Sequence, residues 1–179
     1  LHDVPFDRIK AIYSRSEAVE SVDQIQHPLI RETLRATQLN DPPEVIYMAD
    51  VPANTGLGSS SSFAVGLLNA IYAYQGRAIT PSELAEEAYR LERIVLKESG
   101  GKQDQYVASF GGIISLKIDQ DGKVHCQPID ISQETLVGLE DCLIYFYTGI
   151  KRLGTDIQAQ NVQMIESDRG VTRHSLHRI

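Results

Sequence analysis

The stretch at residues 51–76, VPANTGLGSSSSFAVGLLNAIYAYQG, places two glycines and four consecutive serines directly before a long apolar run. The apolar run is typical of a buried helix. A helix begins with backbone N–H groups that have no partner within the helix, and these groups give its N-terminus a partial positive charge. Because a flexible glycine turn at such an end can wrap around an anion, the stretch predicts a phosphate-binding turn.

The same turn also has a purely structural interpretation. It could be a tight strand-to-helix connection in which one serine caps the helix. It lacks the lysine of a Walker P-loop and the third glycine of a dinucleotide-binding fingerprint. We favour the binding interpretation because capping needs one hydroxyl, whereas residues 59–62 supply four.

The segments around this turn alternate between strand and helix patterns. Strands are predicted at residues 9–14 and 44–51, and a helix at residues 27–37. The helix after the turn should end near Gly76. Its apolar side chains are Phe63, Leu67, Ile71 and Tyr74 on one face and Val65, Leu68 and Tyr72 over much of the rest. An apolar surface on so many sides predicts a helix enclosed by protein.

The next helix is predicted from a capping box, with Thr80 as N-cap, Pro81 at the first helical position and Glu83 at the third. Its apolar stripe is Leu84, Ala88, Leu91 and Val95. At 100° per residue, Glu92 lies on the flank of this stripe and faces inward. The opposite face carries Arg90, Arg93 and Lys97. Taken alone, a residue such as Glu92 is more often an acid whose stem packs while its carboxylate meets water or a basic partner.

The second half of the chain continues the mixture of strands and helices. Two alternating strands at residues 113–118 and 124–129 flank Asp121-Gly122, which favours a hairpin. A buried strand is predicted at residues 142–147 and a helix at residues 156–164. Since no low-complexity linker or repeat interrupts the pattern, one interleaved unit of helices and strands is expected.

Composition and charge exclude several functions. Seventeen basic and twenty-four acidic residues give a net charge of −7, which argues against nucleic acid as a partner. No apolar stretch has the length to span a membrane, and the first residues do not resemble a signal peptide, so we expect a cytoplasmic protein. Cys126 and Cys142 lack metal-ligand spacing and are expected to be reduced thiols.

Asp104 follows a Gly-Gly pair and lies between two glutamines. Such a residue could simply belong to a turn or a cap. Together with the glycine turn and Glu92, however, it completes a set of groups: an anion cradle, hydroxyls suited to a magnesium ion, and two carboxylates to hold the metal and accept a proton. Phosphoryl transfer requires this set, because its transition state is stabilised mainly by positioning and by positive charge around the phosphate.

Three motifs resemble those of a known family. PANTGLGSSSS, at residues 52–62, resembles the second signature of the GHMP kinase superfamily of small-molecule kinases. GGKQDQYVASFGG and YFYTGIKRLGTDI resemble the branch that acts on D-glycero-D-manno-heptose 7-phosphate. The resemblance implies an α+β fold, with an ATP-binding N-terminal lobe similar to the second domain of ribosomal protein S5 at residues 1–150. Residues 151–179 would begin a C-terminal lobe.

The resemblance also implies roles for single residues. The loop that wraps the ATP phosphates would comprise Pro52, Thr55, Gly56, Leu57, Gly58, Ser59, Ser60, Ser61 and Ser62. Ser59 or Ser60, together with Glu92, would bind Mg²⁺. Asp104 would be the general base that withdraws the proton from the sugar hydroxyl. Lys102 is close enough in sequence to influence Asp104.

The sequence also departs from the family pattern. The family's first signature, Pro-Gly-Arg or a relative of it, and its glycine-rich third signature are absent from the sequence. The chain therefore resembles a fragment, whose own activity is in question. Apolar surface that would have packed on the missing parts should be exposed, which favours self-association as a homodimer.

The expected function is an ATP- and Mg²⁺-dependent kinase that phosphorylates a hydroxyl of a heptose phosphate or a related sugar. Galactose-like and fucose-like acceptors remain open. The alternative from another class is a noncatalytic nucleotide- or anion-binding module. Retention of Asp104 and Glu92 beside an intact loop favours the enzyme, because a binding module has no need of a base.

Overall fold

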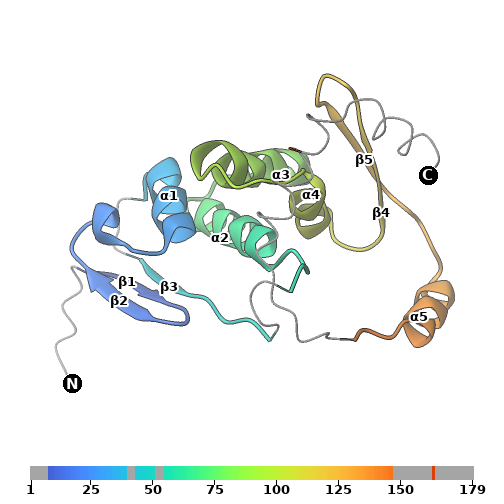
Figure 1. Cartoon of the computed structure of the whole chain (residues 1–179), viewed down its shortest axis with the longest axis horizontal. Helices are drawn as coiled ribbons and strands as arrows, with labels where there is room; N and C mark the ends of the chain where they lie inside the picture. The colour runs from blue at the N-terminus through green and yellow to red at the C-terminus, as the bar shows by residue number, and fades with distance from the viewer. Residues whose placement is uncertain (1–7, 40–42, 51–54, 147–162, 164–179) are drawn as a thin grey trace.

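The computed structural model describes residues 8–39, 43–50, 55–146 and 163. Its elements, in chain order, are β1 (Ile9–Ile12), β2 (Ser16–Val19), η1 (Val22–Gln24), α1 (Pro28–Thr37), β3 (Glu44–Ile46), α2 (Ser59–Tyr74), α3 (Pro81–Tyr89), η2 (Arg90–Val95), α4 (Gln103–Phe110), β4 (Ile114–Ile118), β5 (Val124–Pro128) and α5 (Gln133–Cys142) (Figure 1). The mixture of helices and strands confirms the predicted α+β class.

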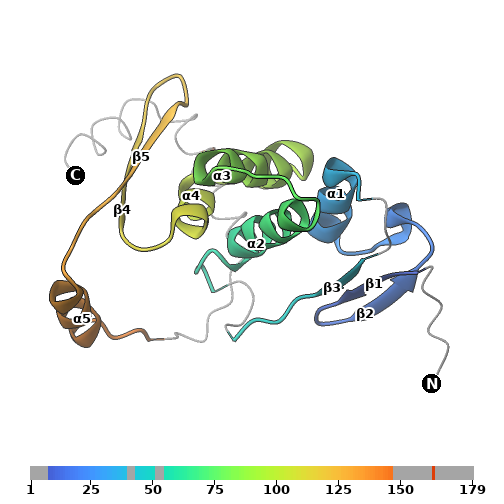
Figure 2. The same cartoon turned by 180° about the vertical axis from the view of Figure 1, so that it is seen from behind.

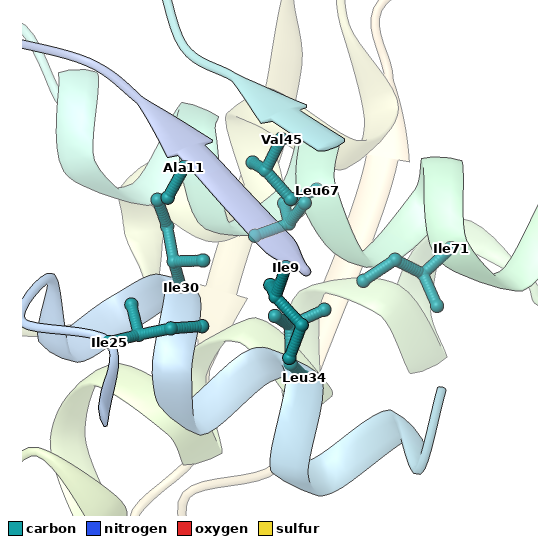
Figure 3. Close-up of a cluster of buried hydrophobic side chains, with 8 residues drawn as sticks. All are labelled: Ile9, Ala11, Ile25, Ile30, Leu34, Val45, Leu67 and Ile71. Atoms are coloured by element: carbon teal, nitrogen blue, oxygen red, sulfur yellow. The ribbon is translucent and has the colours of Figure 1, made fainter. Parts of the chain in front are cut away.

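The first three strands form a small mixed sheet in the order β2-β1-β3. β1 pairs antiparallel with β2 and parallel with β3, with Ala11 opposite Glu17 on one side and Val45 on the other. The strand predicted at residues 44–51 ends early, at Ile46, because β1 offers no partner beyond Ile12. The sheet packs against the helices through one apolar cluster (Figure 3), which comprises Ile9, Ala11, Ile25, Ile30, Leu34, Val45, Leu67 and Ile71.

The long helix α2 lies between two apolar clusters. On its other side it packs against α1, α3 and η2 through a second cluster of Leu29, Ala64, Val65, Leu68, Tyr72, Leu84, Ala88 and Leu91. Both views show α1, α2 and α3 together on the same side of the small sheet (Figures 1 and 2). The prediction of an enclosed helix is correct for these contacts and wrong for Tyr74, which is 68% exposed. Gly76, with φ of +68°, follows the helix end as predicted.

The capping box at α3 is confirmed. Thr80 Oγ1 accepts a hydrogen bond from the Glu83 backbone N–H at 3.3 Å, and the Thr80 N–H donates to Glu83 Oε2 at 2.9 Å. Beyond Tyr89 the helix widens into the π-helical turn η2. A π turn changes the angle between successive residues, so a face computed at 100° per residue drifts.

This drift corrects two predictions from the helical pattern. Val95, predicted on the apolar stripe, is 39% exposed. The side chain of Arg93, predicted on the opposite face, is only 12% exposed and lies 3.4 Å from the Glu98 carboxylate. The prediction for Glu92 is confirmed, because this residue is fully buried.

The C-terminal part of the described chain confirms one prediction and contradicts another. The hairpin forms, with β4 and β5 antiparallel and Gly122 at φ of +84° in the turn. The strand predicted at residues 142–147 is wrong where the structure describes it: Cys142 ends α5, and residues 143–146 are exposed and form no strand. An apolar run becomes a strand only beside a strand that shares its hydrogen bonds.

One helix was not predicted, and some predictions concern residues that the structure does not describe. The sequence analysis missed α5, although Ser132 caps it by accepting from the Thr135 N–H. Figures 1 and 2 show α5 apart from the other helices, and none of its residues is buried. The predicted helix at 156–164, apart from residue 163, and the lobe boundary at 150 lie outside the described residues.

Within the described residues, no helix is both long enough and apolar enough to cross a membrane.

Candidate active site

The N-terminus of α2 has no side-chain cap among the residues that the structure describes. Gly58 is its N-cap residue, has φ of +68° and has no side chain with which to cap the helix. The Ser62 N–H donates to the Gly58 carbonyl at 2.9 Å. The N–H groups of residues 59–61 precede this bond, so no carbonyl of the helix is available to them. They form a set of donors at the positive end of a 16-residue helix, a geometry suited to an anion.

The four serines are in different environments. Ser60 and Ser62 are exposed and Ser59 is half-buried. Ser61 is only 2% exposed, and its Oγ accepts a hydrogen bond from Gln105 Nε2 at 3.1 Å. The hydroxyls of Ser59 and Ser60 are thus the more accessible to a ligand at the helix start, while that of Ser61 already has a protein partner.

The rest of the predicted loop leads into this helix start. Gly56 has φ of +78°, and a Cβ there would meet no atom within 4 Å. Leu57 is 47% exposed, and Thr55 is half-buried. Pro52 lies outside the described residues.

Asp104 lies directly against this loop. It occupies the first turn of α4, and its side chain approaches Gly58 so closely that a Cβ on the glycine would be 3.3 Å from Asp104 Cγ and 3.5 Å from Oδ2. The structure therefore brings together the glycine turn and the predicted base, which are far apart in sequence. A carboxylate at this position is next to any anion bound at the start of α2.

Glu92 is fully buried beside the same helices. Its Oε2 accepts from Gln105 Nε2 at 2.6 Å, while its Oε1 is buried and has no hydrogen-bond partner among the described residues. No ion pair to Glu92 is found within the described ranges. The pKa of the nearby Glu98 is raised above its usual value. Burial is the larger cause, and the charge of Glu92 is the second.

Lys102 does not pair with Asp104. Its ammonium donates to Glu86 Oε1 and Oε2 at 2.8 and 2.9 Å and to the Gly122 carbonyl at 3.1 Å. The Tyr106 hydroxyl donates to Glu86 as well, at 2.7 Å. Burial, followed by these interactions with Glu86, raises the pKa of Tyr106. Lys102 thus joins α4 to α3 and to the tip of the β4–β5 hairpin.

The sequence analysis missed Gln105 and Glu86 as parts of the site. Gln105 follows Asp104 directly, so on a helix its side chain points about 100° away and toward a different neighbour. That spacing was the available signal, but a helix at residues 103–110 had not been predicted.

A magnesium ion fits the residues at this site. Mg²⁺ usually takes one or two carboxylates and completes its coordination with phosphate oxygens and water. Glu92 offers a buried carboxylate oxygen without a partner, and Ser59 and Ser60 offer hydroxyls. The part of the chain that the structure describes holds no cluster of three or more acidic, histidine or cysteine side chains that could bind a metal alone.

A groove of about 910 Å³ runs between β3 and α2 and reaches Ser59 and Ser62. Its walls include Tyr47 and Phe63, whose rings stack with centroids 4.1 Å apart, and the exposed side chains of Ile46, Met48 and Tyr74. Exposed apolar surface was expected from the sequence and is present here. Self-association through it remains a prediction.

Comparison with known proteins gives a family match for part of the chain. Residues 28–112 match the family described as "GHMP kinases N terminal domain". The match runs from α1 through the end of α4 and so contains the glycine turn, Glu92 and Asp104. Residues 28–112 are therefore similar to a GHMP kinase N-terminal domain, as the motifs of the sequence suggested.

Two relatives that resemble this chain are named as kinases of sugars. The chain is 34% identical over 110 residues to D-glycero-alpha-D-manno-heptose 7-phosphate kinase of Campylobacter jejuni, covering 62% of this chain and 32% of that protein. It is 30% identical over 162 residues to L-fucokinase/L-fucose-1-P guanylyltransferase of Bacteroides fragilis, covering 88% of this chain and 16% of that protein. The chain thus spans about a third or less of the length of these relatives.

Solved structures agree on the fold. A D-glycero-D-manno-heptose 1-phosphate kinase from Bacteroides thetaiotaomicron superposes with a TM-score of 0.68 at 27% identity, over 76% of this chain and 49% of that one. A putative sugar kinase from Campylobacter jejuni superposes with a TM-score of 0.64 over 90% of this chain and 56% of that one. At 23% identity, the second similarity concerns the fold alone.

Proposed function

We propose that the protein is an ATP- and Mg²⁺-dependent kinase that transfers the γ-phosphate to a hydroxyl of a heptose phosphate or a related sugar. The observation that carries the proposal is the contact between Asp104 and Gly58, which puts a carboxylate at the open, positive end of α2. An anion site and a proton acceptor are then adjacent, as transfer of a phosphoryl group to a hydroxyl requires.

The residues around α2 would act in binding and in proton transfer. Backbone N–H groups of residues 56–61 would hold the phosphates of ATP and fix the γ-phosphate for attack. Asp104 would accept the proton of the sugar hydroxyl as its oxygen attacks phosphorus. The buried side of α2, packed on two apolar clusters, keeps these donors fixed in space.

Glu92 and the hydroxyl of Ser59 or Ser60 would hold the magnesium ion. When bound, such an ion neutralises charge that develops on the transferred phosphate. Glu92 is suited to this role because its carboxylate is buried, carries no ion pair within the described ranges and retains an oxygen without a partner.

The names of the relatives support the acceptor. A heptose 7-phosphate kinase, a heptose 1-phosphate kinase and a fucokinase are among the proteins that this chain resembles. We infer that the small-molecule partner is a sugar phosphate. We also infer that the protein acts in the cytoplasm, because ATP is available there. Since the chain spans only part of its relatives, the activity belongs to the full-length protein.

A noncatalytic nucleotide-binding module is the second candidate. The position of Asp104 argues against it. A carboxylate beside a phosphate site repels the ligand, so a module that only binds would lose affinity by keeping it. The chain is also 32% identical over 75 residues to a mevalonate kinase of Methanothermobacter thermautotrophicus. For this reason the test below includes an acceptor that is not a sugar.

The test is a panel of sugar phosphates, free sugars and mevalonate, offered to the full-length protein with ATP and Mg²⁺. We expect phosphate transfer to a heptose phosphate. In the Asp104→Asn variant, transfer should fall by about 10²- to 10⁴-fold, while ATP binding is retained or becomes tighter because the repelling charge is gone. Equal turnover in this variant would exclude Asp104 as the base. ATP binding without transfer to any acceptor would favour the noncatalytic module.

A further inference from the structure

Gln105 occupies the centre of the site and has no solvent exposure. It lies in the first turn of α4, and its amide nitrogen contacts two other elements. Nε2 donates to Ser61 Oγ, in the first turn of α2, at 3.1 Å, and to Glu92 Oε2, in η2, at 2.6 Å. One side chain therefore connects the phosphate-binding helix to the buried carboxylate.

The orientation of this amide follows from the charge of its neighbour. A glutamine amide has two N–H bonds, and here each has its own acceptor. The reverse orientation would direct the carbonyl oxygen at the Glu92 carboxylate and leave that charge without a donor. A buried carboxylate without a hydrogen bond is strongly unfavourable, so Glu92 selects the observed orientation.

A neutral donor also leaves the charge of Glu92 intact. An arginine or lysine at position 105 would pair with the carboxylate and compete with any other cation for it. The amide instead fixes one oxygen by a short hydrogen bond, while the second oxygen, Oε1, stays buried without a partner. This is the arrangement expected of a carboxylate that is oriented by one neighbour and reserved for a cation.

Two neighbouring residues of α4 contact different parts of the site. Asp104 points to Gly58 in the loop, whereas Gln105 points to Ser61 and Glu92. The first turn of α4 therefore sets the separation between the proton acceptor, the start of α2 and the buried carboxylate.

We propose that Gln105 is a positioning residue that orients Glu92 toward a divalent cation and, through Ser61, keeps that carboxylate in register with the phosphate-binding end of α2. The proposal rests on the proposed function, because the cation is the one that accompanies ATP.

The test uses Gln105→Met in the full-length protein, because methionine keeps the length and volume of the side chain but donates no hydrogen bond. ATP binding is measured by calorimetry across a Mg²⁺ titration and again in EDTA. We expect the Mg²⁺ concentration for half-maximal enhancement of binding to rise about 10- to 100-fold, the usual effect of removing such a supporting contact. Affinity in EDTA should change less than about threefold, since the N–H donors of α2 remain.

Two controls separate positioning from general damage. Gln103→Met changes the same residue type in the same turn of α4, where Gln103 is exposed, and should leave the Mg²⁺ requirement unchanged. In a Glu92→Gln background, Gln105→Met should have no further effect on the Mg²⁺ requirement, because the residue through which it acts has lost its charge.

The outcomes distinguish this inference from the proposed function. Wild-type protein that binds no ATP, with or without Mg²⁺, would overturn both. Mg²⁺-dependent binding in the wild type with the same Mg²⁺ requirement in Gln105→Met would overturn the role of Gln105 alone. Should the methionine variant fail to fold, Gln105→Glu decides: it keeps the length but places an oxygen against Glu92, and an unchanged Mg²⁺ requirement in that variant would also overturn the proposal.

Discussion

The carboxylate of Asp104 packs against the backbone of Gly58, at a distance that leaves little room for a Cβ on the glycine. The contact joins the start of α4 to the start of α2, and so places an acid beside the open N–H groups of a helix. Glycine suits position 58 for two reasons. The close approach of Asp104 leaves little room for a Cβ, and the φ of +68° is a conformation that glycine adopts easily.

We predict that Gly58→Ala damages both stability and the site. A left-handed backbone conformation costs an alanine about 1–2 kcal/mol. The new Cβ would also lie 3.3 Å from Asp104 Cγ and displace that carboxylate by a few tenths of an ångström. Phosphate transfer should therefore fall about tenfold or more, which corresponds to about 1.4 kcal/mol.

Gly76→Ala is the matched control for this prediction. Gly76 has the same φ of +68°, but nothing lies within 4 Å of its Cβ position. Denaturant unfolding should give a similar loss of stability for the two variants, with transfer activity retained only in Gly76→Ala. If both variants keep their activity, the Asp104–Gly58 contact does not matter for the reaction.

The serines should separate into structural and ligand-binding roles. Ser61→Ala leaves a donor of the buried Gln105 amide without an acceptor, and should lower the free energy of unfolding by about 1–3 kcal/mol. Ser60 and Ser62 are exposed, so their alanine variants should stay within about 0.5 kcal/mol of the wild type. Urea denaturation of the three variants tests this, and equal stability of all three would contradict the buried hydrogen bond.

A tyrosine titration tests the contact that links α3 and α4. The pKa of Tyr106 is raised above 10.0, first by burial and then by its hydrogen bond to Glu86. Glu86→Gln should lower this pKa but leave it above 10.0, because the side chain stays buried. Ultraviolet absorbance reports the ionisation, and Tyr106→Phe identifies its contribution among the eight tyrosines.

The same shift predicts the alkaline stability. Between pH 10.0 and the higher pKa of the folded protein, unfolded Tyr106 has lost its proton while folded Tyr106 keeps it. The unfolded chain then binds fewer protons, so stability falls as the pH rises. This decline should be smaller in Tyr106→Phe. An identical decline in variant and wild type would show that Tyr106 is not its cause.

His27 should make the start of α1 sensitive to mild acid. Its Nδ1 accepts a hydrogen bond from the Ile30 N–H at 3.4 Å, which a protonated ring cannot do. Burial lowers the pKa of His27 below 6.5, although Glu17 opposes the shift. As the pH falls through 6.5 toward the folded pKa, the unfolded chain takes up the proton first, so stability is lost.

The measurement for His27 is thermal unfolding at about pH 7.5 and about pH 5.5. His27→Asn keeps a capping side chain without a titrating ring, and should therefore reduce this pH dependence. The variant keeps the other titrating groups, so they cancel in the comparison. An unchanged pH dependence in His27→Asn would contradict the role of the cap.

Local patterns in the sequence were sufficient to predict the elements that depend on near neighbours. The glycine turn before α2, the capping box of α3 and the β4–β5 hairpin each arise from residues a few positions apart, whose backbone preferences act within one turn. The inward direction of Glu92 followed from helical periodicity, because the π-helical turn alters the register only slightly at that position. Motif resemblance added the family and the expected roles of Asp104 and the loop.

Only the tertiary structure decided which of these groups meet. Asp104 reaches Gly58, and Gln105 reaches Ser61 and Glu92, because α4 packs against α2 and α3, and no periodicity in the sequence encodes that packing. Lys102 pairs with Glu86 instead of Asp104 for the same reason. The apolar run from Cys142 shows the converse: its residues favour a strand, but a strand needs hydrogen bonds from a neighbour, and only the folded arrangement determines whether one is there.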